Sequence, residues 1–223
     1  MADLDVVVLS GEGRYADPWH DFPGTSARIA EVLTEHGLTA RVCGTDSSEP
    51  VSARLLVVNA GGGADAIPGE PDDAGSRWRE AVLVHALAGG PVLATHAATN
   101  TFYDEHRWPH VLGGRWVPGT SMHPPGGPAT VQVATHEHPI TAGLPAEVDI
   151  VDERYSFLEV SQQIVPLLTQ VHDGVVHPIV WTHEGGVDGV AVRAVVDTLG
   201  HDVPAYGAVR ADLLRREVDW LLR

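Results

Sequence analysis

The chain has 223 residues, of which 43% are hydrophobic and 20% charged, and its formal net charge is −16. This length suits one domain with a single well-filled core, and the composition is ordinary for a globular protein. The excess of acidic residues argues against binding to nucleic acid or anionic membranes. No apolar run approaches the roughly 18 residues of a membrane span. Neutral polar small molecules remain the natural ligands.

Two residue types exclude further chemistry. The chain contains no lysine, which excludes Schiff-base catalysis and the P-loop lysine of nucleotide hydrolases. Its only cysteine, Cys43, permits neither an internal disulfide nor a cysteine-based zinc site. Cys43 ends an apolar run and is interpreted as a buried structural thiol. The N-terminus is acidic where a signal peptide is basic, so we expect a cytoplasmic protein.

The first half of the chain alternates β-branched runs with helical patterns. Strands are predicted at residues 5–10, 38–43, 54–59 and 91–95, and helices at residues 25–36 and 76–88. This β-α-β-β-α-β order predicts a three-layer, doubly wound α/β fold of the flavodoxin-like kind, with a mostly parallel sheet. Ligand groups in such folds lie at the carboxyl ends of the strands.

The second half has a different pattern, with short alternating segments and turns between them. Additional strands are predicted at residues 129–134, 148–152, 164–171, 176–183 and 189–197, and a closing amphipathic helix at residues 206–222. Because no linker or repeat separates the halves, we predict a single domain over residues 1–223.

The loop after the first strand formally matches a dinucleotide-binding fingerprint at residues 11–16. In that fold the helix opens within the glycines, whereas here Pro18 and Pro23 delay the predicted helix to about residue 25. The segment is therefore interpreted as a tight turn followed by a functional loop, in which His20 and Asp21 are candidate binding residues.

The strongest local signal lies at residues 91–99, where an apolar strand meets a sharp turn of small residues. This is the layout of a nucleophile elbow, and His96 occupies the place of the nucleophile. An imidazole there does not open the acyl-transfer route of cysteine or serine. It can act as a general base, a hydrogen-bond donor or a metal ligand.

Seven short motifs, taken in order along the chain, resemble one known family. They are His96-Ala-Ala-Thr99-Asn-Thr101-Phe-Tyr103, Leu112-Gly-Gly-Arg115, His123-Pro-Pro, the run from His138 to Pro145, Asp152-Glu153-Arg-Tyr155, the run from His177 to Glu184, and Leu199-Gly-His201-Asp202. The ordered set resembles the ThuA-like (trehalose-utilisation) family over about residues 6–223. The resemblance implies a class I glutamine amidotransferase-like fold and a role in the catabolism of trehalose or related sugars.

Histidines gather at predicted strand ends and loops. Together with Glu153 they suit a zinc or other divalent metal site, for which the candidates are His20, His96, His123 and His183. A metal-free site, in which imidazoles and carboxylates bind sugar hydroxyls, is the equal alternative. Asp152 and Glu153 are adjacent in a strand and point to opposite faces, so only one of them enters the site.

Two functions follow from these residues. The first is an enzyme acting on a trehalose-related or keto sugar; the second is a non-catalytic sugar-binding or regulatory module. Glutamine amidotransferase activity is excluded because the elbow lacks a cysteine. We expect catalytic roles for His96, Glu153 and His183, and substrate binding by His20, Asp21, Thr99, Tyr103, His123, Tyr155 and His201. The expected partner is a small sugar, with no nucleic acid or membrane, and a homodimer is the expected assembly.

Overall fold

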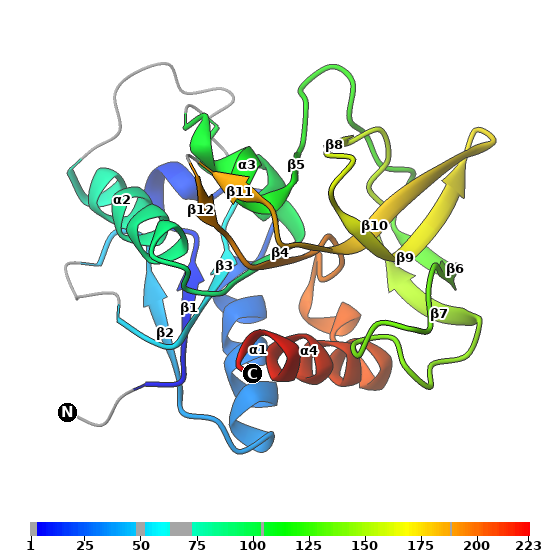
Figure 1. The fold of residues 1–223 in the computed structure, drawn as a ribbon, viewed down its shortest axis with the longest axis horizontal. Coiled ribbons are helices and arrows are strands. Elements are labelled where there is room, and N and C mark those ends of the chain that lie inside the picture. Colours follow the sequence, from blue (N-terminus) through cyan, green and yellow to red (C-terminus); the bar gives the residue numbers. More distant parts are fainter. Residues whose placement is uncertain (1–3, 48–51, 63–72, 104, 188) are drawn as a thin grey trace.

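A nine-stranded sheet with helices on both faces forms the frame of the molecule in a computed structural model (Figure 1). The structure describes residues 4–47, 52–62, 73–103, 105–187 and 189–223. Helices α1 (Phe22–Glu35) and α4 (Ala208–Leu221) cover one face, and α2 (Asp73–Leu87) and α3 (Arg107–Leu112) lie on the other. The predicted three-layer, doubly wound α/β class is confirmed.

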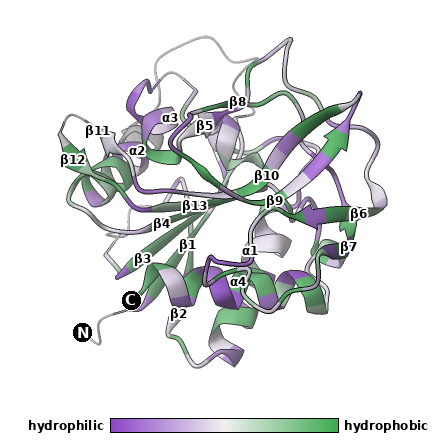
Figure 2. Cartoon of the chain, turned by 45° about the vertical axis from the view of Figure 1, so that its right-hand side comes forward, coloured by the Kyte–Doolittle hydropathy of each residue, from purple (hydrophilic) through white to green (hydrophobic). Residues whose placement is uncertain are grey.

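Five parallel strands form one half of the sheet, in the order β2-β1-β3-β4-β13. Their bounds are Ala40–Gly44, Val6–Ser10, Leu55–Asn59, Val92–Thr95 and Ala194–Asp197. Every residue of β1, β3, β4 and β13 is buried, since helices cover both faces, and these central strands are mainly hydrophobic (Figure 2).

Four antiparallel strands complete the sheet, in the order β10-β9-β6-β7 after β13. They span Val175–His183, Val165–His172, Gly127–Val133 and Glu147–Asp152. Two small ribbons pair β5 (Gly114–Arg115) with β8 (Glu159–Val160) and β11 (Gly186–Val187) with β12 (Val190–Ala191). The strand predicted at residues 189–197 is therefore two strands, β12 and β13.

Helix ends differ from the predicted ones for local reasons. Helix α1 begins at Phe22, three residues early, because Asp21 caps it by accepting a hydrogen bond from the Gly24 amide, and Pro23 is well tolerated in a first turn. Helix α4 begins at Ala208, because Tyr206 still belongs to the end of a 3-10 turn, Val203–Ala205, and Gly207 is the N-cap.

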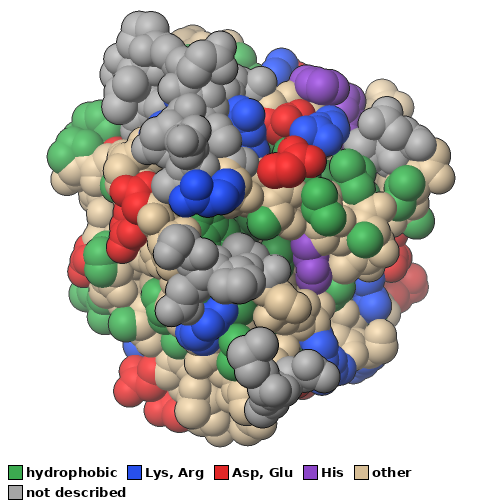
Figure 3. All heavy atoms as spheres, turned by 90° about the vertical axis from the view of Figure 1, so that its left-hand side faces the viewer, with side chains coloured by type: hydrophobic (Ala, Val, Ile, Leu, Met, Phe, Trp, Pro, Cys, Tyr) green, Lys and Arg blue, Asp and Glu red, His purple; other side chains and the backbone are tan. Residues whose placement is uncertain are grey.

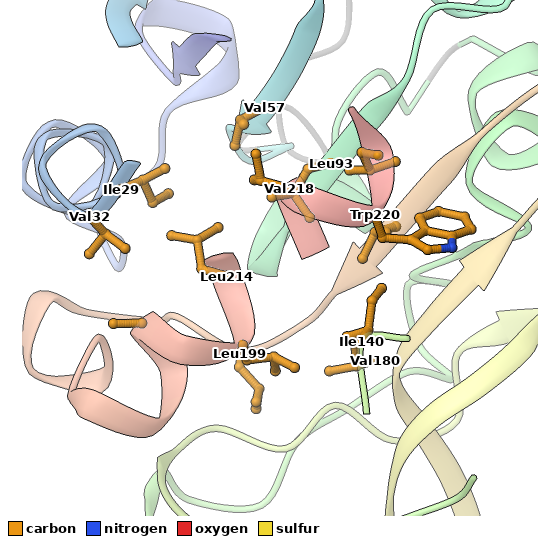
Figure 4. Packing of buried hydrophobic residues seen from close by; sticks show 14 of the residues in the cluster. Ile29, Val32, Val57, Leu93, Ile140, Val180, Leu199, Leu214, Val218 and Trp220 are labelled. Atoms are coloured by element: carbon orange, nitrogen blue, oxygen red, sulfur yellow. The ribbon is translucent and has the colours of Figure 1, made fainter. Parts of the chain in front are cut away.

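One core cluster joins α1 and α4 to both halves of the sheet (Figure 4). Ile29 and Val32 of α1 face Leu214 and Val218 of α4, and the cluster continues into the antiparallel half through Val180. None of the helices within the described residues is long and apolar enough to cross a membrane. On the face that bears α2 and β2, acidic and basic side chains are interspersed (Figure 3).

A buried ionic group ties α4 to the end of β13. The Arg210 guanidinium lies 3.0 Å from an Asp197 carboxylate oxygen and 3.5 Å from one of Glu217, and all three side chains are buried. Burial and the charge of Asp197 raise the pKa of Glu217 well above its usual range. Asp197 also accepts a hydrogen bond from the Leu199 amide, where the chain turns toward the site.

Replacing Arg210 therefore tests how firmly α4 holds that turn. We expect Arg210→Met to lower the free energy of unfolding by about 3–5 kcal/mol, because it leaves a buried carboxylate without its partner. The matched control is Arg215→Met, on the same helix as Arg210. It removes a more exposed ion pair with Glu35 of α1 and should lower the free energy of unfolding by less than about 1 kcal/mol. Urea unfolding of both variants measures the difference, and equal losses would contradict a structural role for the buried group.

Candidate functional site

The site is built around a strained turn after β4. The chain passes from Thr95 directly into a short 3-10 helix, His96–Asn100, and the backbone of His96 adopts φ +45°. A left-handed conformation in a residue other than glycine costs of order 1–3 kcal/mol and concentrates at functional sites. The small neighbours Ala97 and Ala98 allow the turn, and the His96 side chain is 2% exposed.

The imidazole of His96 has one nitrogen fixed and the other directed at polar groups. Its Nδ1 lies 2.8 Å from the Thr198 carbonyl oxygen, to which it donates a hydrogen bond, so a neutral ring presents a lone pair at Nε2. The Tyr155 hydroxyl and His20 Nε2 each lie 3.1 Å from this Nε2. Burial, followed by the charges of Glu153 and Asp152, raises the pKa of Tyr155 well above its usual range, so its hydroxyl remains a donor.

His20 is oriented in the same way by Asp17. Its Nδ1 lies 2.7 and 2.8 Å from the two Asp17 carboxylate oxygens, and Asp17 also accepts from the backbone amides of Trp19 and His20. Burial raises the pKa of Asp17, but the hydrogen bond and charge of His20 outweigh it and lower that pKa. A neutral His20 thus keeps its proton on Nδ1 and turns a lone pair at Nε2 toward His96.

Two imidazole lone pairs 3.1 Å apart repel each other unless a cation lies between them. Each Nδ1 already donates its proton, to the Asp17 carboxylate in His20 and to the Thr198 carbonyl in His96. A further, shared proton or a metal ion between the two Nε2 atoms would remove this repulsion. Either one would also present positive charge to a ligand.

Glu153 supplies the matching negative charge. Its Oε2 lies 3.5 Å from His96 Nε2, 3.4 Å from His201 Nδ1 and 3.5 Å from His123 Nε2. Burial raises the pKa of Glu153, but the hydrogen bond to His96 and the charges of the three histidines outweigh it and lower that pKa, so the group is a carboxylate. Three imidazoles thus surround one carboxylate oxygen.

Asp152 points to the other side of β7 and supports the loop that carries His201. It accepts hydrogen bonds from the backbone amides of Gly200 at 2.6 Å and His201 at 3.2 Å. Burial raises its pKa and prevails over the charge of His96 and these amide bonds. The adjacent carboxylates therefore have different roles: Glu153 enters the site, and Asp152 binds the backbone of the loop that carries His201.

These groups open into a cavity of about 530 Å³. Histidine, carboxylate and aromatic side chains make up most of its lining, which consists of Asp17, Trp19, His20, Gly62, Ala97, Asn100, Trp116, His123, Glu153, Tyr155 and His201. Trp116 and Tyr155 meet edge to face with ring centroids 4.8 Å apart, and Trp19 is 73% exposed at the mouth. A second hollow of about 590 Å³, between β6, β7 and α4, has no histidine in its described lining.

Five of the expected residues are not part of this lining. His96 is one of them, but it contacts the lining through His20 and Tyr155. The other four lie elsewhere. His183 lies at the opposite edge of the sheet, because β10 runs antiparallel to β13 and pairs His183 with Ala194, which itself pairs with Val92 at the start of β4. Its Nδ1 lies 3.1 Å from the Val111 carbonyl oxygen, which indicates a structural role. The other three are Asp21, which caps α1, Thr99, which is buried, and Tyr103, which is 59% exposed.

The site also contains groups that were not predicted from the sequence. Asp17 is three residues before His20, a spacing that brings a carboxylate onto a loop imidazole, so that local signal was available. Trp116 directly follows the Gly-Gly-Arg motif, and a tryptophan there is more often a core residue than part of a site. The Thr198 carbonyl gave no signal in the sequence, because it is a backbone group brought to His96 from more than one hundred residues away.

The comparisons with known proteins agree with this fold. The family model described as trehalose utilisation, ThuA, matches residues 6–220, and the chain belongs to this family. No curated protein sequence matches the chain.

Solved structures give the same fold at low sequence identity. A ThuA-like protein of Parabacteroides merdae has a TM-score of 0.73 and 18% identity, and the match covers 99% of this chain and 90% of that chain. A ThuA-like protein of Bacteroides uniformis has a TM-score of 0.69 and 17% identity, and the match covers 99% of this chain and 92% of that chain. A glutamine amidotransferase of Thermotoga maritima has a TM-score of 0.57 and 10% identity, with full coverage of both chains. The class I amidotransferase-like fold is thus confirmed.

The role assigned to Asp152 is tested by truncation. We expect Asp152→Ala to lower the free energy of unfolding by about 2–4 kcal/mol, because buried backbone amides of the His201 loop lose a charged acceptor. Asp149→Ala, on the same strand, removes an exposed hydrogen bond to Thr130 and should change stability by less than about 1 kcal/mol. Chemical unfolding distinguishes the two, and similar small losses would show that the loop does not depend on Asp152.

Proposed function

We propose that the chain is an enzyme of sugar catabolism that acts on a trehalose-related or keto-sugar substrate. The observation that carries this proposal is the lining of the 530 Å³ cavity, which combines histidines and carboxylates with the rings of Trp19, Trp116 and Tyr155. Polar groups that converge between aromatic walls suit a ligand with many hydroxyls on a flat ring. The family description, trehalose utilisation, supports the same class of substrate.

The reaction that best fits these groups is the removal of a proton from a carbon next to a sugar carbonyl. The charge that develops on the carbonyl oxygen needs positive charge and hydrogen-bond donors that are already in place. The paired rings of His20 and His96 supply the first, and the Tyr155 hydroxyl supplies the second.

His123 is the candidate base. Its Nδ1 lies 3.1 Å from the Pro124 carbonyl oxygen, which leaves a lone pair on Nε2 when the ring is neutral. The side chain lines the cavity and is 35% exposed, so a ligand can reach it. An imidazole is suited to proton transfer near neutral pH.

A cysteine or serine nucleophile has no support in this site. Cys43 is buried on β2, and the described lining of the cavity has no cysteine or serine. The elbow position, where an acyl-transfer enzyme carries its nucleophile, is held by His96 with one nitrogen bound to the Thr198 carbonyl. This favours proton transfer over acyl transfer.

Hydrogen–deuterium exchange tests the proposed reaction directly. When keto-trehalose is incubated with the protein in D₂O, deuterium should enter the sugar at the carbon next to the carbonyl, as measured by NMR. Trehalose itself should not exchange. We expect His123→Gln to slow the exchange by about 10²–10⁴-fold and His96→Ala by about 10²–10³-fold. His110→Gln changes an exposed histidine on α3 and is the matched control.

Two results would contradict the proposed enzyme. Binding of the sugar without exchange or any product would identify a sugar-binding module on an amidotransferase-like fold, the second function that the sequence left open. Exchange that His96→Ala and His123→Gln leave unchanged would place the reaction outside this cavity.

A further inference from the structure

We propose that His20, His96, His201 and Glu153 bind a divalent transition-metal ion, zinc or a neighbour in the first row. One ligand atom from each of these four side chains lies within 4.8 Å of the other three. The side chains come from four separate segments: the loop after β1, the elbow after β4, the end of β7 and the loop after β13. The part that the ion plays in turnover rests on the proposed function, whereas its binding does not.

The distances between the ligand atoms suit a small ion. Tetrahedral zinc with bonds of about 2.0–2.1 Å has ligand atoms roughly 3.4 Å apart. The corresponding separations are 3.1 Å from His20 Nε2 to His96 Nε2, 3.5 Å from His96 Nε2 to Glu153 Oε2, and 3.4 Å from Glu153 Oε2 to His201 Nδ1. These are three of the six separations. The other three are within 4.8 Å, so the set must contract to form a tetrahedral coordination shell.

Two of the three rings have the outer partners of metal-bound histidines. A ligating imidazole usually donates its other N–H to a carboxylate or a backbone carbonyl, which fixes the tautomer and aims the lone pair at the metal. His20 has the carboxylate of Asp17 and His96 has the carbonyl of Thr198 in these places. His201 Nδ1 is buried and has no hydrogen-bond partner among the described residues.

The charges of the cavity also favour a cation. Its lining includes the carboxylates of Asp17 and Glu153, and the described residues of that lining include no arginine. Three imidazoles with a single carboxylate oxygen favour zinc, iron, nickel or copper, whereas magnesium and calcium prefer oxygen ligands. The Tyr155 hydroxyl, 3.1 Å from His96 Nε2, lies beside the ligands on the cavity wall, so an ion here would be open to a sugar oxygen.

Titration of the chelator-treated protein with zinc, cobalt, nickel and manganese salts tests the site. Isothermal calorimetry should give one ion per chain for at least one of these metals. We expect Glu153→Gln and His201→Gln to weaken binding by more than about 100-fold, and the outer-shell variant Asp17→Asn by about 10–100-fold. His110→Gln is the matched control, because it changes an exposed histidine on α3 that lies outside the cavity, and it should bind the ion like the wild type.

Several outcomes overturn the proposal. Absence of binding by the folded wild type, verified by circular dichroism, would show that a shared proton holds the rings of His20 and His96. Binding that Glu153→Gln, His201→Gln and Asp17→Asn all leave unchanged would place the ion elsewhere. The metal site and the proposed reaction fail separately: one bound ion without deuterium exchange contradicts only the reaction, and exchange by a protein that binds no ion contradicts only the metal site.

Discussion

The site depends on the position in which the fold holds His96. Its backbone is fixed at φ +45° at the end of a fully buried strand, and its Nδ1 is bound to the Thr198 carbonyl, so Nε2 has one direction available. Hydrogen bonds from neighbouring residues hold this strained turn. The Trp108 indole donates to the Ala98 carbonyl, and the Thr101 hydroxyl donates to the Ala60 carbonyl. The arrangement at Nε2 follows from this rigidity.

The parallel half of the fold could be predicted because burial on both faces leaves a clear signal. Strands such as β1 and β3 are continuous apolar runs, and the structure differs from their predicted bounds by a single residue. The antiparallel half was predicted as strands, but their direction and order were not, since pairing between β9 and β10 or between β6 and β7 depends on contacts that no local pattern records. Two-residue strands such as β5 are too short to show a period.

The same distinction explains the site. His20, His96 and His201 were nominated because they follow strands, and the fold brings them together at the carboxyl edge of the parallel strands. His183 was nominated by the same rule, which fails where a strand runs the other way. The groups that orient the rings, above all the Thr198 carbonyl, come together only in the tertiary structure. The facing lone pairs of His20 and His96 likewise leave no trace in the sequence.

The most direct test of this account is the protonation state of two imidazoles in the metal-free protein. Long-range ¹H–¹⁵N NMR of histidine-labelled protein, assigned with His20→Gln and His96→Gln variants, reports which ring nitrogen carries the proton. We expect both rings to be protonated at Nδ1 and their Nε2 atoms to share one proton. A His96 ring protonated at Nε2 and bare at Nδ1 would contradict it, because the lone pair would then point at the Thr198 carbonyl and away from the site.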